Sequence, residues 1–173
     1  DDDLLEILGQ STNPTVIQSH LKKLFQGIDK VVFGANNETI SAMLSVQGEH
    51  VPLSRPVRVV PQVEVWLQNL SDEMRSTLKK LSVEAIREEN VDPARYPSQV
   101  LCLAEQVRFC RDCEQALDGS KDFAKLKASL QEQLKTYTNT KVSDVVLDLK
   151  LKALILDLIH HIDVVDQLIS NKA

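Results

Sequence analysis

Two cysteines have the spacing in this sequence that most suggests a chemical role. Cys110 and Cys113 are separated by two residues, as in many metal-binding and thiol redox pairs. A structural zinc site needs four converging ligands, and a redox pair usually lies at the start of a helix that follows a strand. The apolar pattern places both cysteines inside a helix, with Cys102 upstream on the same helix. We therefore favour small helix residues without a metal.

Histidines are the second candidates, because their side chains titrate near neutral pH. His160 and His161 are adjacent, and neighbouring residues on a helix point about 100° apart, so they cannot chelate one ion together. We expect one of them to face a neighbouring element and the other to face water. His20 and His50 are isolated in the sequence. A structural role is favoured for all four histidines.

Acidic pairs occur at Asp1 to Asp3, at Glu88 and Glu89, and at Asp163 with Asp166. General acid or base catalysis needs a desolvated carboxyl group. These pairs stand beside other charged residues, so we expect their carboxylates to lie at helix ends and on solvated helix faces. The five glycines lie too far apart for a phosphate-binding loop, and no nucleophile elbow is present. The sequence therefore predicts no catalytic residue, no cofactor-binding residue and no metal ligand.

Composition narrows the class of protein. The chain has 173 residues, of which 43% are hydrophobic and 26% charged, as in an ordinary soluble protein. Its net charge of −5, without a basic stripe, argues against a nucleic-acid partner. No apolar run reaches the roughly 18 residues of a membrane span, and no signal peptide is present. Three cysteines suit a reducing compartment, and the absence of an initiator methionine leads us to expect a cytosolic piece of a larger protein.

The stretch 142–169 is the helix around which the other elements must be organised. Its apolar residues recur at helical spacing, and a second apolar flank (Val145, Leu147, Leu156 and Val164) predicts neighbours on more than one side. A helix of this length, roughly 40 Å, needs several partners. Further helices are expected at residues 4–8, 13–25, 62–90, 98–117 and 123–139. Trp66 belongs to an apolar helical stripe, where core packing is the first interpretation and an interface anchor the second.

Between the helices, residues 30–60 read as a small antiparallel β-meander. Ile40, Ala42 and Leu44 alternate with polar or smaller residues in a period of two. Prolines at 52, 56 and 61 indicate an edge strand or an extended connector, and so small a sheet must lie on the helices or on another part of the parent protein. We predict a mainly α fold, an elongated helical bundle or arch with this meander inserted. Residues 1–61 form one subdomain and residues 62–173 a four-helix part.

Several stretches resemble the linker of the dynein heavy chain family, and the resemblance extends along essentially the whole chain. They are residues 1–9, residues 13–28, residues 40–53, Val63 to Leu67 with Met74 to Leu78, residues 97–106, and residues 149–157 with residues 162–165. Within the family they are most similar to the dynein 2 group, the motors of retrograde intraflagellar transport. Residues 87–95 and 135–146 match that pattern least.

The resemblance implies a mechanical part. In dyneins the linker is a helical arch that crosses the ring of AAA+ modules, joins it to the cargo-binding tail and bends with the nucleotide state. The implied partners are the ring, the tail and, indirectly, the microtubule and intraflagellar transport trains, in the cytoplasm, cytoskeleton and cilium. ATP and Mg belong to the ring, so this segment is expected to be non-catalytic and without a cofactor.

A small charged edge sheet also suggests where a linker could touch the ring. We hypothesise that Glu49, His50, Arg55 and Arg58 form a ring contact. The competing functional class is a free-standing helical scaffold or adaptor that binds partner helices through apolar stripes. An enzyme or a thiol-metal protein comes third.

Overall fold

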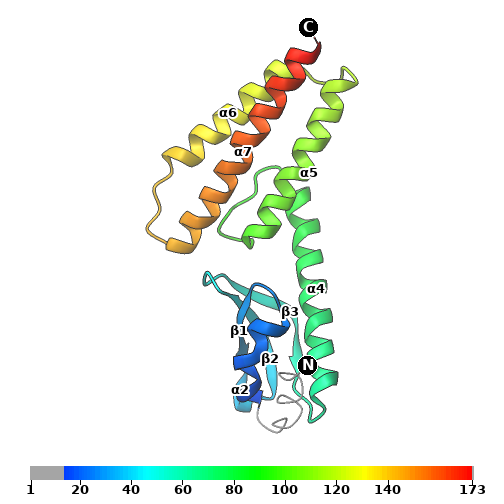
Figure 1. Cartoon of the computed structure of the whole chain (residues 1–173), viewed down its shortest axis with the longest axis vertical. Helices are drawn as coiled ribbons and strands as arrows, with labels where there is room; N and C mark the ends of the chain where they lie inside the picture. The colour runs from blue at the N-terminus through cyan, green and yellow to red at the C-terminus, as the bar shows by residue number, and fades with distance from the viewer. Residues whose placement is uncertain (1–13, 173) are drawn as a thin grey trace. The chain divides into compact units, whose positions relative to one another are not determined.

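The computed structural model describes residues 14–172 (Figure 1). The predicted mainly α fold with a small antiparallel sheet is confirmed. No helix in this part of the chain is long and apolar enough to cross a membrane. The helix predicted at residues 4–8 lies outside the described residues. The elements in order are α2 (Pro14–Ile17), η1 (Gln18–His20), α3 (Leu21–Leu24), β1 (Ile28–Phe33), η2 (Ala35–Asn37), β2 (Thr39–Ser45), β3 (His50–Arg58), α4 (Val63–Arg87), α5 (Ser98–Leu117), α6 (Phe123–Asn139) and α7 (Val145–Lys172).

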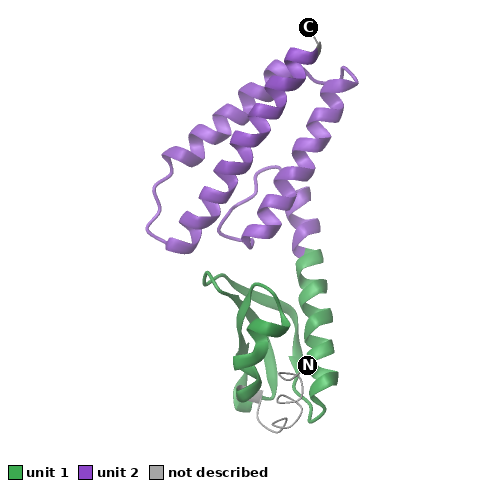
Figure 2. Cartoon of the chain, viewed as in Figure 1, with its two compact units in different colours: residues 1–80 green, residues 81–173 purple. Residues whose placement is uncertain are grey.

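The chain divides into two compact units at residues 80 and 81, within α4 (Figure 2). Unit 1 comprises residues 1–80, and unit 2 comprises residues 81–173. The subdomain boundary that the sequence suggests, between residues 61 and 62, lies just before α4 and stays a prediction.

Unit 1 is built on the three-stranded sheet, whose order is β1-β2-β3 with antiparallel neighbours. The alternation along β2 buries Ile40 and Ala42, as predicted, but Met43 is buried as well. Both faces of this strand are therefore covered. Strand β3 contains Pro52 and Pro56 and is an edge strand, as expected.

The helical stretch before the sheet is not the single helix that the sequence predicts. A 3₁₀ turn, η1, separates α2 from α3. Within η1, the Gln18 side-chain Oε1 accepts a hydrogen bond of 3.2 Å from the Val31 N–H of β1. Ile17 and Leu21 are buried, and Gly27, with φ of 84°, ends the segment in a conformation that favours glycine. This segment thus lies against β1, the edge strand on the other side of the sheet from β3.

Unit 2 contains α5, α6 and α7, with α7 packed against both other helices. Its apolar core is formed by Ala116, Phe123, Leu126, Leu130, Leu158 and Val165. The predicted second flank of α7 is only partly correct, because Val145 and Leu156 are 71% and 68% exposed. They extend an apolar stripe that no described element covers.

Carboxylates fix the starts of two helices in unit 2. Asp122 accepts a hydrogen bond of 2.8 Å from the Ala124 N–H at the start of α6. Asp144 accepts bonds of 2.8 and 3.1 Å from the N–H groups of Val146 and Leu147 at the start of α7. The helix α5 begins at Ser98, and Pro97 precedes it as the N-cap residue. Proline suits this place because its φ is fixed.

Candidate functional site

The four residues of the hypothesised ring contact lie on β3 and on the turn before it, but they do not form one cluster. Glu49 is half-buried in the turn, and His50, Arg55 and Arg58 are exposed. At about 3.3 Å per residue, His50 and Arg58 are roughly 25 Å apart along the strand. The structure therefore separates an acidic and imidazole end from an arginine end.

The arginine end of β3 carries a bulge that α4 holds in place. In the pairing with β2, residues 53–56 of β3 lie opposite the single residue Ser41. Two N–H groups that the ladder leaves unpaired find side-chain acceptors on α4. Ser54 N–H donates to Thr77 Oγ1 at 2.9 Å, and Arg55 N–H donates to Glu73 Oε1 at 2.9 Å. Side chains of α4, and not a further strand, thereby satisfy these two N–H groups of the bulge.

These contacts hold two polar side chains of α4 away from solvent. Glu73 and Thr77 are 8% and 1% exposed. Glu73 also pairs with the guanidinium of Arg55, whose Nε lies 3.5 Å from Glu73 Oε2. Arg55 is thus part of the unit 1 structure, whereas no ion pair of Arg58 occurs among the ion pairs described for residues 14–172.

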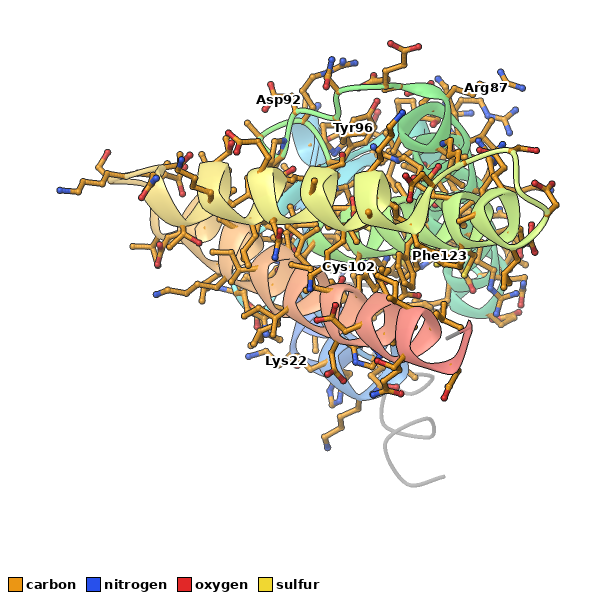
Figure 3. All side chains as sticks on the ribbon, turned by 90° about the horizontal axis from the view of Figure 1, so that it is seen from above. Lys22, Arg87, Asp92, Tyr96, Cys102 and Phe123 are labelled. Carbon is orange, nitrogen blue, oxygen red and sulfur yellow. The ribbon has the colours of Figure 1, made fainter. Side chains whose placement is uncertain are left out.

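The three cysteines are all free thiols. Cys110 is exposed, and Cys102 and Cys113 are half-buried on α5. Burial raises the pKa of Cys102 to about 11, and a hydrogen bond to Asp157 acts in the same direction. Burial also raises the pKa of Cys113. Neither thiol is activated as a thiolate, and no group of three metal-ligating side chains is found in the described part of the chain. Cys102 is labelled among the unit 2 helices in Figure 3.

The adjacent histidines divide as predicted, with His160 exposed and His161 buried. His161 faces the neighbouring helix α5. Its ring stacks on Phe109 of α5, with centroids 3.9 Å apart and planes inclined by 4°. Burial lowers the pKa of His161, against the attraction of Asp157. Its Nδ1 has no hydrogen-bond partner and lies 4.0 Å from Glu105 Oε1.

Glu105 is the buried carboxylate that the sequence analysis missed. Its residue is 7% exposed on α5, in the same helical row as the buried Leu101. Burial raises the pKa of its carboxyl group, although Arg108 and a hydrogen bond from Gln133 oppose the shift. The sequence does hold one signal of this burial, because Glu105 stands four positions after Leu101 and therefore on the same side of the helix.

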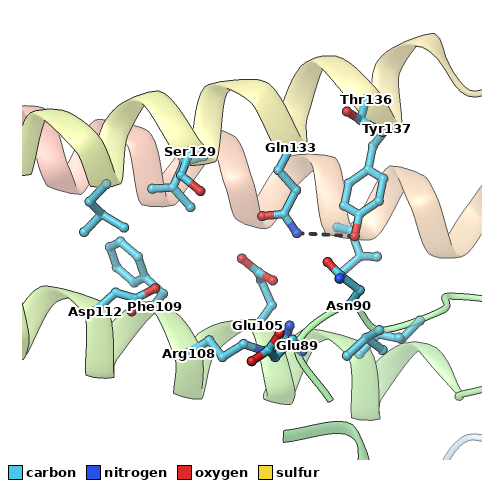
Figure 4. Close-up of a pocket in the computed structure, with 15 residues that line it drawn as sticks. Glu89, Asn90, Glu105, Arg108, Phe109, Asp112, Ser129, Gln133, Thr136 and Tyr137 are labelled. Carbon is cyan, nitrogen blue, oxygen red and sulfur yellow. Dashed lines mark hydrogen bonds between the residues drawn. The ribbon is translucent and has the colours of Figure 1, made fainter. Parts of the chain in front are cut away.

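A pocket of about 500 Å³ opens beside Glu105. Figure 4 shows Glu105 pointing from α5 toward Gln133 and Tyr137 of α6. The Gln133 Nε2 group donates to the Tyr137 hydroxyl at 3.3 Å. The lining residues are Glu89, Asn90, Val91, Leu101, Glu105, Arg108, Phe109, Asp112, Leu126, Ser129, Leu130, Gln133, Thr136, Tyr137 and Leu154. All of them belong to unit 2.

Two acids of the remaining predicted carboxylate pairs, Glu88 and Asp166, have structural partners. Glu88 accepts hydrogen bonds from Arg95 Nη1 at 2.9 Å and from the buried Tyr96 hydroxyl at 2.6 Å, so it is not simply a solvated acid. These bonds join the end of α4 to the loop that bears Asp92 and Tyr96 in Figure 3. Asp166 pairs with Lys127, and Asp163 is exposed. The residues Asp1 to Asp3 lie outside the described part of the chain.

Trp66 packs in the core of unit 1. It lies on α4 and is 1% exposed, and Leu70, one turn later on the same stripe, is fully buried. The first of the two interpretations, a core residue, is therefore confirmed. An indole buried to this extent within its own unit is not available as an interface anchor.

Comparisons with known proteins show similarity to dynein heavy chains. Residues 1–85 match the family model described as dynein heavy chain, N-terminal region 2. Cytoplasmic dynein 2 heavy chain 1 of Caenorhabditis elegans is 64% identical over all of this chain, and the Homo sapiens protein of the same name is 49% identical over 97% of it. The cytoplasmic dynein heavy chain of Dictyostelium discoideum is 33% identical over 97%.

The chain spans only 4% of the length of each of these relatives. Identity extends over both units, however, since the alignment with the C. elegans protein covers 173 residues. These matches show that residues 1–85 are similar to the N-terminal region 2 of dynein heavy chains, and that the whole chain is similar to a segment of the cytoplasmic dynein 2 heavy chain.

Proposed function

We propose that the chain is a non-catalytic linker segment of a dynein motor, which transmits ATP-driven changes in the AAA+ ring to the tail. The movement it serves is minus-end-directed motility on microtubules, and in the cell it is retrograde intraflagellar transport. The segment works in the cytoplasm and the cilium as part of the cytoskeleton. Its direct partners are the ring and the tail of the same heavy chain, and ATP and Mg are bound by the ring.

The observation that carries this proposal is the 64% identity to a cytoplasmic dynein 2 heavy chain along the entire chain. The matching family model describes an N-terminal region of the heavy chain, which agrees with a role apart from ATP hydrolysis. The sequence also has no glycine-rich phosphate loop. Long packed helices such as α4, α5 and α7 suit a segment that must resist bending under load.

The test replaces residues 1–173 in the complete motor by a flexible linker of equal span. We expect ATP hydrolysis to continue while ATP-driven microtubule gliding collapses, because the ring then lacks a stiff connection to the tail. The matched control is the unaltered motor at the same surface density. Gliding at normal speed by the replaced motor would reject the force-transmitting role.

A contact with the ring through Glu49, His50, Arg55 and Arg58 remains our hypothesis for this segment. The structure indicates Arg58 as the residue to change, because Arg55 pairs with Glu73. No ion pair of Arg58 is found among those described for residues 14–172. Arg58→Glu should slow gliding without loss of unit 1, and Arg75→Glu on the exposed face of α4 is the matched control. If gliding and ATP hydrolysis are both unchanged in Arg58→Glu, the arginine end of β3 makes no such contact.

The alternative function is a helical scaffold or adaptor that binds partner helices. It is favoured by the exposed apolar residues of α7, among which Val145, Leu156 and Ile159 are at least half exposed. The replacement experiment separates the two functions. An adaptor should leave gliding speed intact and reduce only the amount of cargo that moves with the motor.

A further inference from the structure

We propose that the pocket between α5 and α6 binds a lysine or arginine side chain presented by a segment of a partner protein, with the Glu105 carboxylate as its counter-ion. This inference goes beyond the transmission of force and does not depend on it. It concerns a binding site that lies wholly within unit 2.

The pocket has the right size and a suitable distribution of apolar surface. Its volume of about 500 Å³ exceeds that of any single side chain, so the end of an extended lysine or arginine can enter with part of its backbone at the mouth. Leu101, Leu130 and Leu154 supply apolar walls, from three different helices. Such walls suit the methylene stem of a long cationic side chain.

The charge of the lining favours a cation. Three carboxylates, those of Glu89, Glu105 and Asp112, face one guanidinium, that of Arg108. Asp112 is already paired with Lys121. Arg108 donates from Nη2 to the Ala85 carbonyl at 3.4 Å, and it forms no ion pair with Glu105 among those described for residues 14–172. An excess of negative charge thus remains in the pocket.

Glu105 is a buried carboxylate for which no ion pair with a lysine or arginine is found among the described residues, although the charge of Arg108 attracts it. Its side chain is 9% exposed, and the ion-pair contact recorded for it is the 4.0 Å approach of His161 Nδ1. His161 has a lowered pKa because it is buried, so the ring is neutral at pH 7 and does not balance the charge. A buried carboxylate without a cation is costly, and a bound ammonium or guanidinium group relieves that cost.

Further acceptors stand around the carboxylate. Figure 4 shows Gln133 and Tyr137 above Glu105 and Asn90 beside them. Amide and hydroxyl oxygens at these places can accept the N–H groups that a single carboxylate leaves unpaired, since a guanidinium has five of them. The site therefore combines a counter-ion, neutral hydrogen-bond acceptors and apolar walls. Together these groups suit a lysine or arginine side chain.

The test uses the 173-residue chain and nuclear magnetic resonance titrations with N-acetyl-arginine methylamide and N-acetyl-lysine methylamide as probes. We expect saturable shifts that include the Gln133 side-chain amide. N-acetyl-citrulline methylamide, which has the shape of the arginine probe without its charge, should bind at least about tenfold more weakly, because a charged hydrogen bond is lost. Equal binding of the citrulline probe, or shifts confined to residues outside the pocket, would overturn the proposal.

Two pairs of variants locate the binding. Glu105→Gln should weaken the arginine probe about tenfold or more, whereas Glu114→Gln, the same charge change on an exposed position of α5, should leave its affinity unchanged. Ser129→Trp should block the mouth from the side of α6, and its neighbour Ala128→Trp, which does not line the pocket, should not. The tryptophan pair decides the matter even if Glu105→Gln fails to fold. Wild-type affinity in Ser129→Trp would place the probe elsewhere.

Discussion

Among the described residues, each unit buries one glutamate almost completely, and the two glutamates differ in what surrounds them. Glu73 in unit 1 is 8% exposed and accepts the Arg55 N–H at 2.9 Å, beside the Arg55 guanidinium. Glu105 in unit 2 is 7% exposed and has Gln133 as its hydrogen-bond donor, with no lysine or arginine in ion-pair contact among the described residues. The two glutamates are therefore equally buried but have different roles. One carboxylate completes the fold, and the other is left for a ligand.

The largest effects should come from the apolar cores, which set the scale for the comparison. Leu70 in unit 1 and Leu158 in unit 2 are both fully buried. Leu70→Ala and Leu158→Ala should each lower the free energy of unfolding by about 2–5 kcal/mol, because each leaves a cavity. Urea denaturation measures both values. A loss below about 1 kcal/mol in either variant would mean that the corresponding core is not packed as described.

Removing the Glu73 carboxylate should have the next largest effect. Glu73→Leu leaves the Arg55 N–H of the bulge without its acceptor, so we expect a loss of about 1–3 kcal/mol. Glu73→Gln keeps an acceptor oxygen and should recover much of that loss. The control is Glu64→Leu at an exposed position of the same helix. If Glu73→Leu unfolds at the wild-type urea concentration, the carboxylate does not support the bulge.

The same substitution at Glu105 should behave differently. Glu105→Leu removes a buried carboxylate that forms no ion pair with a lysine or arginine among the described residues, so the free energy of unfolding should stay within about 1 kcal/mol of wild type or rise. Gln133 keeps the Tyr137 hydroxyl as a partner. Urea denaturation at pH 7, run beside Glu73→Leu, makes the comparison direct. A loss as large as that of Glu73→Leu would show that Glu105 is structural.

The smallest effects should appear in the pH dependence of unit 2. The pKa of Glu105 is raised, so its protonated form stabilises the fold fully below the unfolded value near 4.5, and this contribution is lost as pH rises through the folded pKa. The pKa of His161 is lowered, so its neutral form stabilises the fold above the unfolded value near 6.5, and this contribution is lost as pH falls through the folded pKa.

Two variants separate these opposing contributions. Glu105→Gln should remove the decrease in stability on raising the pH above about 4.5, and His161→Leu should remove the decrease on lowering it below about 6.5. His160→Leu, the exposed neighbour, is the control for the second variant. Unfolding free energies measured between pH 4 and pH 8 provide the test. If the curves of unfolding free energy against pH were parallel for wild type and Glu105→Gln, the pKa of Glu105 would be the same in the folded and the unfolded protein.

The helices and the sheet were open to prediction because each has a local pattern. The apolar spacing of α7 and the alternation in β2 are set by 3.6- and two-residue periods, which act within a few neighbours. The break of the first helical stretch at η1 follows instead from a distant contact, the bond from Val31 N–H to Gln18. No pattern in the residues around Gln18 predicts a partner so far along the chain.

The candidate site was harder to predict for the same reason. Glu73 and Glu105 both look like ordinary helix acids, and what distinguishes them lies on other elements, the β3 bulge for one and α6 and α7 for the other. The sequence did indicate that one of His160 and His161 would be buried, since adjacent helix residues cannot face the same way. Which of them is buried depends on Phe109, across the helix pair.

The burial of Trp66 gives the two units separate optical signals. It is the only tryptophan in the chain and lies in unit 1, so its fluorescence emission reports the hydration of that unit. Far-ultraviolet circular dichroism is dominated by the long helices, most of which are in unit 2. A red shift in emission at a lower urea concentration than the loss of ellipticity would therefore reveal that unit 1 melts first, without any label on the protein.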